Sequence, residues 1–157
     1  LTDENAVAEF KLDDGSVVIM NEDTKLKIEC PKVNNRQLQL SAGNIKINAV
    51  KLNAGASFKI TTPTAVCAVR GTDFLISVET EDNTELDVFE GAVETEIMDN
   101  SRAQKKIVNA NESANIYKNK LDLFKGIREK SEIIANIIKN KMHIRKLIKT
   151  RKLLKQK

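Results

Sequence analysis

Short alternating runs of apolar and polar residues fill the first three quarters of the chain. Examples are Phe10-Lys11-Leu12, Leu38-Gln39-Leu40, Ile45-Lys46-Ile47 and Leu86-Asp87-Val88. Each run is too short for a helix and has the two-residue period of a half-buried strand. Turn-forming Gly, Asn and Asp residues separate the runs. The pattern therefore predicts a mainly β domain over residues 1–118.

These runs repeat around glycine. The shared pattern is apolar, any, apolar, two turn residues, Gly, and then a second alternating pair of apolar residues. Five of the six glycines occupy this place, and they are Gly15, Gly43, Gly55, Gly71 and Gly91. Glycine at a tight turn supplies a backbone angle that other residues resist. The repeat predicts stacked strand–turn–strand units in an elongated, twisted and curved β-sandwich or solenoid-like sheet.

The pattern changes at about residue 119. Isoleucines and leucines now come in pairs, at 133–134, 137–138, 147–148 and 153–154, and Gly126 is the only Gly or Pro from residue 121 onward. At about 100° per residue, the first two pairs share one broad face. The sequence thus predicts a second unit over residues 119–157, a basic amphipathic helical extension.

A heptad-like seam runs along this expected helix. Its members are Ile133, Ile137, Asn140, Ile144, Leu147, Arg151 and Leu154. A buried Asn in such a seam can set the register of a coiled coil. Two interpretations stay open: the helix docks on its own β domain, or it mediates association with another protein or a second copy of the chain.

Charge is distributed unevenly between the two units. Residues 125–157 contain 12 Lys or Arg and 2 Asp or Glu, which leaves 14 and 20 of the 26 and 22 for residues 1–124. Cations on one helix contact phosphates well, but no aromatic residue follows Phe124 to stack on bases. An apolar face fits a protein or a membrane surface better. Nucleic acid is therefore not the favoured partner.

The residues that carry common enzyme chemistry are scarce. His143 is the single histidine, and with only Cys30 and Cys67 it cannot complete a four-ligand zinc site without carboxylates. No serine has a histidine partner nearby in the sequence, and no Gly-rich loop precedes a helix. We expect neither enzymatic activity nor a cofactor. No run of 18 apolar residues is present, so no membrane span is expected. Whether the two cysteines form a disulfide stays open.

One stretch, from Thr62 to Phe74, combines turn residues with charge in strand-like surroundings. Its notable members are Thr62, Pro63, Arg70, Gly71, Thr72 and Asp73. Pro63 pushes the preceding residue into extended geometry, and a charged residue in such a context needs a partner. We expect Arg70 to pair with Asp73 or Glu90 in a structural lock between adjacent repeats. The alternative is that this arginine binds a ligand.

The same stretch resembles the signature of FecR-like domains, in which a Thr-Pro strand leads to a Val-Arg-Gly-Thr turn. Two further segments are similar to the family, and they occur in the same order: Leu12-Asp13-Asp14-Gly15-Ser16-Val17 and Val88-Phe89-Glu90-Gly91-Ala92-Val93. The resemblance implies a long, curved β structure without an active site. In the regulators that name the family, such a domain relays a signal from an outer-membrane receptor to a sigma factor.

The resemblance also implies a periplasmic or exported cell-envelope location, with a signal peptide removed before Leu1. The chain looks closer to free-standing envelope members of the family than to the iron-signalling regulators. We therefore expect a non-enzymatic protein-interaction, scaffold or signal-relay module, with the C-terminal helix mediating docking or assembly onto other envelope proteins. The alternative is a module that binds cell-wall polysaccharide, although Tyr117 and five Phe offer few aromatic rings for sugars.

Overall fold

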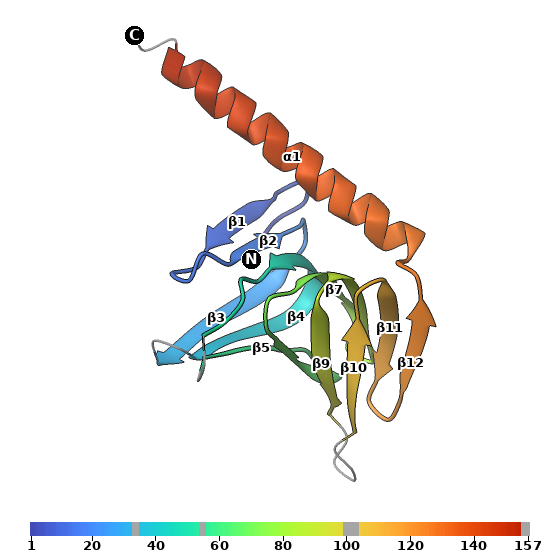
Figure 1. Ribbon diagram of the computed structural model, residues 1–157. Coiled ribbons are helices and arrows are strands. Elements are labelled where there is room, and N and C mark those ends of the chain that lie inside the picture. Colours follow the sequence, from blue (N-terminus) through green and yellow to red (C-terminus); the bar gives the residue numbers. More distant parts are fainter. Residues whose placement is uncertain (33–34, 54–55, 99–103, 155–157) are drawn as a thin grey trace.

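The computed structural model describes residues 1–32, 35–53, 56–98 and 104–154, and it consists of twelve strands followed by one helix (Figure 1). The strands are β1 (Ala8–Lys11), β2 (Val17–Met20), β3 (Lys25–Lys32), β4 (Asn35–Asn48), β5 (Ser57–Thr61), β6 (Ala65–Val69), β7 (Asp73–Thr80), β8 (Asn83–Glu90), β9 (Ala92–Ile97), β10 (Lys105–Asn109), β11 (Glu112–Tyr117) and β12 (Leu121–Lys125), and the helix is α1 (Glu129–Leu154). The predicted mainly β fold with a long C-terminal helix is confirmed.

The long strand β4 organises the whole fold, because it pairs with four other strands. Its first half is antiparallel to β3 and parallel to β5, and its second half is antiparallel to β2 and β7. We call the strands β1-β2-β4-β7-β8-β11-β12 sheet A and the strands β3-β4-β5-β6-β9-β10 sheet B. The two sheets face each other across the core and share β4. At the far side β10 lies beside β11, so the structure is nearly closed.

Gly43 lies where β4 passes from sheet B to sheet A. Its φ is +88°, and a Cβ atom there would come within 2.4 Å of Thr24 Oγ1 and 2.7 Å of the Asp23 carbonyl oxygen. The glycine repeat predicts a turn here, and that prediction is wrong, since hydrogen-bonded strand continues on both sides. Glycine serves instead to let one strand bend between two sheets against the neighbouring β2–β3 connection.

Beyond β4, hairpins alternate between the sheets. The β5–β6 and β9–β10 hairpins belong to sheet B, and the β7–β8 and β11–β12 hairpins belong to sheet A. The corners between successive hairpins contain Gly71, Gly91 and Asn111, all with positive φ. The corners are also stacked, because a Cβ on Gly91 would lie 2.6 Å from the Gly71 carbonyl oxygen. The glycine repeat thus marks changes of sheet as well as turns.

The remaining predicted turn glycines differ in outcome. Gly15 connects β1 and β2, which pair with each other, so this glycine is in a hairpin as predicted. Gly71 and Gly91 do lie between strands, but the strands that they connect are in different sheets. Gly55 lies outside the described residues. The spacing of the glycines therefore located turns at Gly15, Gly71 and Gly91, but it did not show which turns join strands of the same sheet.

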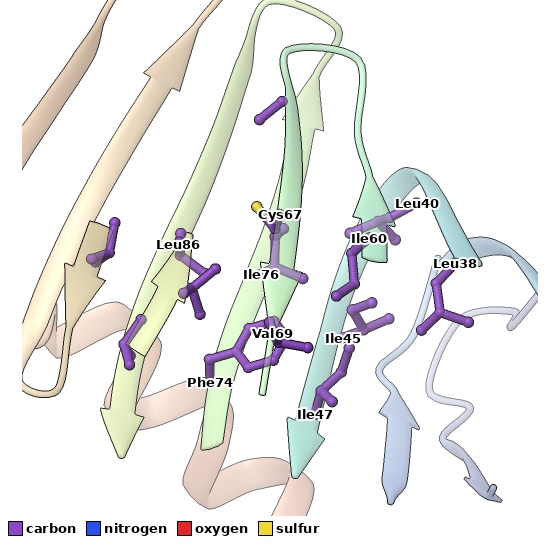
Figure 2. Packing of buried hydrophobic residues seen from close by; sticks show 14 of the residues in the cluster. Leu38, Leu40, Ile45, Ile47, Ile60, Cys67, Val69, Phe74, Ile76 and Leu86 are labelled. Carbon is purple, nitrogen blue, oxygen red and sulfur yellow. The ribbon is translucent and has the colours of Figure 1, made fainter. Parts of the chain in front are cut away.

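Aliphatic side chains from both sheets fill the interior. Figure 2 shows Ile45, Ile47, Phe74, Ile76 and Leu86 of sheet A, together with Leu38, Leu40, Ile60, Cys67 and Val69 of sheet B, in one packed cluster. All ten are at most 5% exposed. Because successive residues of a strand point to opposite faces, this cluster uses the alternation seen in the sequence. Phe58 and Phe74 are the fully buried aromatic side chains.

The helix begins later than the sequence suggested. Residues 121–125, expected to be helical, form β12, which pairs with β11 from Leu121↔Ile116 to Lys125↔Glu112. Gly126 follows with φ +90°, and α1 starts at Glu129. The expected boundary at 118/119 therefore falls inside the β11–β12 hairpin. The alternation Leu121-Asp122-Leu123 is a strand pattern that the neighbouring isoleucine pairs obscured.

We predict that Gly43→Ala lowers the free energy of unfolding by about 3 kcal/mol, because it adds backbone strain and a clash with Thr24. The matched control is Gly126→Ala. Gly126 also has a positive φ, but no atom lies within 4 Å of its added Cβ, so strain alone should cost about 1 kcal/mol. Urea unfolding followed by circular dichroism measures both. Equal losses would contradict the role assigned to the β4 crossing.

Candidate functional site

The junction between α1 and sheet A is centred on a buried carboxylate, Asp87. It lies on β8 between Leu86 and Val88, which face the core, so its side chain points to the opposite, outer face of the sheet. Even so, Asp87 is 0% exposed. A buried charge requires a full set of partners. These partners come from β11 and from the start of the helix.

Three side chains satisfy the Asp87 carboxylate. Its Oδ2 atom accepts from Arg128 Nη1 at 2.6 Å and from Ser131 Oγ at 2.7 Å. Its Oδ1 atom accepts from Ser113 Oγ on β11. Ser131, like Asp87, is buried. The carboxylate therefore binds the adjacent strand and the first turn of α1 at the same time.

Arg128 extends this junction across the sheet. Its Nη2 atom donates to the Ala114 carbonyl oxygen and to Asn115 Oδ1, both at 2.6 Å. Its own carbonyl oxygen accepts from the backbone N–H groups of Ser131 and Glu132, both at 3.0 Å, which starts the helix. A negative charge at a helix N-terminus is electrostatically favourable. The pair is thus hydrogen-bonded on both sides, as a buried ion pair must be.

One face of α1 continues the contact with the β domain. The half-buried and buried residues of the helix recur every three or four positions, at Ser131, Ile134, Ala135, Ile138, Lys141 and Met142. Ile138 is only 1% exposed. Two ion pairs flank this face, Lys130 with Glu79 on β7 and Lys141 with Glu22 after β2. We call the six residues from Ser131 to Met142 that recur on this side of the helix the docked face. It ends at Met142.

The seam predicted from the heptad pattern lies on a different side of α1. Ile133, Ile137, Ile144 and Leu147 are 51%, 41%, 55% and 56% exposed, and Asn140 is exposed too. The side chains of Arg151 and Leu154 lie outside those that the structure describes. In each adjacent pair of isoleucines, about 100° of rotation separates the two side chains. One member of each pair therefore faces the sheet while the other faces solvent.

Thr62 and Thr64 connect the two sheets instead of forming a site. Thr84 Oγ1 donates to Thr62 Oγ1 at 2.8 Å. Thr64 Oγ1 lies 2.7 Å from Thr84 Oγ1 and 2.9 Å from the Ile116 carbonyl oxygen. The turn at Pro63 between β5 and β6 is thereby tied to β8 and β11 of sheet A. All three threonines are buried, so this hydroxyl cluster is structural.

The expected lock of Arg70 with Asp73 or Glu90 is wrong. Arg70 is exposed, and no ion pair of this arginine occurs among the described residues. Asp73 instead pairs with Lys46 of β4, which also lies 4.3 Å above the centroid of the Phe89 ring. Burial lowers the pKa of Lys46 to about 8, although the nearby Glu90 carboxylate acts to raise it. Asp73 therefore does take part in an ion pair, but the cation is Lys46 of β4 and not Arg70.

Thr72 and Gly71 help to stack the corners of the sandwich. Thr72 Oγ1 donates to the Ala92 carbonyl oxygen at 3.0 Å, and the Thr72 backbone exchanges hydrogen bonds with Ala49. A Cβ on Gly71 would meet Lys51 Cα at 3.2 Å. The motif around residue 70 therefore holds neighbouring connections together.

Arg70 itself borders a shallow, solvent-open hollow on the outer face of sheet B. Ala68, Ala92, Glu94 and Ile107 line it with Arg70. Because it is open to solvent, the hollow offers little enclosure for a ligand. A ligand-binding role for Arg70 stays a prediction.

Cys67 is a free thiol in the core. It is fully buried on β6, and burial raises its pKa to about 12, against the effect of the Thr95 hydroxyl. The side chain of Cys30 lies outside those that the structure describes. Cys67 thus acts as a small apolar core residue.

No metal-binding cluster of three or more His, Cys, Asp or Glu occurs in the described parts of the chain. Within the same residues, no helix has the length and apolar content needed to cross a bilayer. The organised polar cluster that the structure does show at the helix is the Asp87 junction, which sequence reasoning missed. Its residues look ordinary in the sequence, because Asp87 alternates with apolar neighbours as the solvent-facing residues do.

Comparison with known proteins identifies the family. The family model described as FecR protein matches residues 1–94. The chain therefore belongs to the FecR family, as its Thr62–Phe74 stretch and the two flanking segments suggested.

Solved structures share the fold. Two crystal structures described as a "putative anti-sigma factor" from Parabacteroides distasonis ATCC 8503 align with TM-scores of 0.67 and 0.68 at 19% identity. The alignments cover 85% and 87% of this chain and 61% and 62% of those chains, so this chain spans about three fifths of their length. A comparison with curated proteins gave no match.

We predict that Asp87→Ala lowers the free energy of unfolding by about 3–5 kcal/mol, because it leaves Arg128 without its counter-charge in a mostly buried position. Hydrogen exchange should accelerate in residues 129–142 as the helix detaches. The matched control, Glu79→Ala, removes an exposed ion pair of the same helix and should cost less than about 1 kcal/mol. If both variants lose the same stability, Asp87 is not the anchor.

Proposed function

We propose that the chain is a non-enzymatic signal-relay module of the cell envelope that works through protein partners, with α1 as its docking element. Membership of the FecR family supports a regulatory role. The fold that it shares with the anti-sigma factor structures supports the same class of function. The envelope location rests on the family resemblance of the residue 62–74 stretch.

The observation that carries this proposal is the anchoring of α1 at Asp87. The junction holds the first turn of the helix against strands β8 and β11 through charge-assisted hydrogen bonds. At the same time the predicted seam faces away from the domain. A helix that is fixed at one end and exposes apolar side chains along its length can bind a partner while it stays attached to the sheet.

We predict that deleting the gene changes a defined set of transcripts, and that the wild-type chain restores them. The double variant Ile144→Ser/Leu147→Ser should fail to restore them, because it removes apolar contacts from the exposed side of α1. The control Ile28→Ser changes an exposed isoleucine on strand β3 of sheet B and should restore them fully. RNA sequencing provides the measurement.

One outcome would reject the relay. If the transcripts do not respond to the deletion, no signal passes through the chain. If the purified chain then also sediments with cell-wall polysaccharide, the glycan-binding alternative replaces the relay.

We predict that the protein fractionates with the cell envelope. Cells are separated into cytoplasmic, membrane and periplasmic fractions, and the chain is detected with an antibody beside a marker for each fraction. Recovery with the cytoplasmic marker alone would remove the envelope from the proposal while leaving the interaction role intact.

A further inference from the structure

Helix α1 has two apolar sides, and the β domain covers only one. The second side carries Ile133, Ile137, Ile144, Leu147 and Ile148, which we call the outer stripe. Each of its members is at least 41% exposed. At about 100° per residue, the centre of the outer stripe lies about 130° around the helix from the centre of the docked face. A binding surface can therefore approach the outer stripe without meeting sheet A.

The outer stripe is long enough for an extended contact. From Ile133 to Ile148 the helix rises about 22 Å, or roughly four turns. The docked face ends at Met142, whereas the outer stripe continues through Ile148. Figure 1 shows that the C-terminal part of α1 extends past the strands. This part of the helix thus exposes apolar side chains that its own domain does not cover.

Charge decides between the possible occupants. Residues 139–157 contain nine Lys or Arg and no Asp or Glu. A second copy of the chain would bring its own strongly basic helix beside this one, and like charges repel. A coiled-coil partner would also meet polar Asn140 in the seam, while Ile148 lies outside the heptad positions. An anionic lipid surface attracts the cations, and it requires no heptad spacing of the apolar side chains.

We infer that the outer stripe of α1 binds the surface of an anionic lipid bilayer. The helix lies in the plane of the membrane, with the isoleucines and Leu147 of the outer stripe between the acyl chains and the basic C-terminal part of the helix at the headgroups. Each cation near such a surface adds to the attraction, which salt screens. The β domain then stands on the side of the helix away from the lipid. This inference rests on the proposed role of α1 as a docking element. It makes a lipid surface the site where the outer stripe docks and leaves the protein partners of the relay to the rest of the chain.

Vesicle sedimentation tests the inference on the full chain. The chain is mixed with vesicles of phosphatidylcholine containing about 30% phosphatidylglycerol, and with vesicles of phosphatidylcholine alone. We expect sedimentation with the anionic vesicles, and at least about tenfold weaker binding to the neutral ones and in roughly 0.5 M NaCl. Ile144→Ser/Leu147→Ser should weaken binding at least about tenfold. Ile28→Ser, on strand β3 of sheet B and away from both the outer stripe and the Arg70 hollow, should bind as the wild type does.

A second measurement reports where the helix lies. The chain contains no tryptophan, so Ile148→Trp introduces a single fluorescent probe in the outer stripe. Its emission should shift to shorter wavelength with the anionic vesicles, as expected for an indole ring entering the bilayer interface. The control Ile28→Trp, on strand β3, should show no shift. Circular dichroism verifies that each variant remains folded.

Several results would overturn the inference. Absence of sedimentation with anionic vesicles would do so, as would binding that the double serine variant leaves unchanged, which would reduce the contact to charge alone. A dimer in analytical ultracentrifugation that the double variant dissociates would make a second copy the occupant. In each of these cases a transcript response that still depends on the outer stripe would leave the relay standing, so the two proposals fail separately.

Discussion

The fold depends on one strand having to belong to two sheets. Strand β4 pairs with β3 and β5 along its first half and with β2 and β7 along its second, and Gly43 lies between the halves. At this point the backbone of the β2–β3 connection comes so close that no side chain fits. Because every other strand reaches β4 directly or through a neighbour, the position of this bend orients both sheets and the core between them.

The buried carboxylate of Asp87 explains how the helix is placed. Sheet A has one face in the core, and on its other face Leu75, Ser77 and Asp87 are buried as well. Asp87 bears a charge there, so burial is tolerated only because Ser113, Arg128 and Ser131 complete its hydrogen bonds. Removing the helix would expose to water a polar cluster that is buried in the structure. The first half of the C-terminal helix is therefore an integral part of the packing on sheet A.

Much of the architecture could be predicted from the sequence, and less of the candidate site. Period-two alternation identified the strands that fill the core, and the isoleucine pairs identified the helix. The Thr-Pro to Arg-Gly-Thr stretch led to the correct family. The expected pairing of Arg70 with Asp73 or Glu90, however, is wrong, because Asp73 pairs with Lys46. Lys46 and Asp73 are 27 positions apart and meet only through β4–β7 pairing. Asp87 was missed for the same reason, since Arg128 lies 41 positions away.

The sequence by itself determined the class of fold, the position of a long helix after the β domain and the apolar character of that helix. These properties follow from local periodicity, which any segment carries without its neighbours. Only the tertiary structure decided which glycines reverse the chain and which move it between sheets. It also decided which carboxylate would be buried, and which side of α1 the sheet would cover. Those outcomes depend on strand register and on contacts between distant residues, and a pattern along the chain does not specify either.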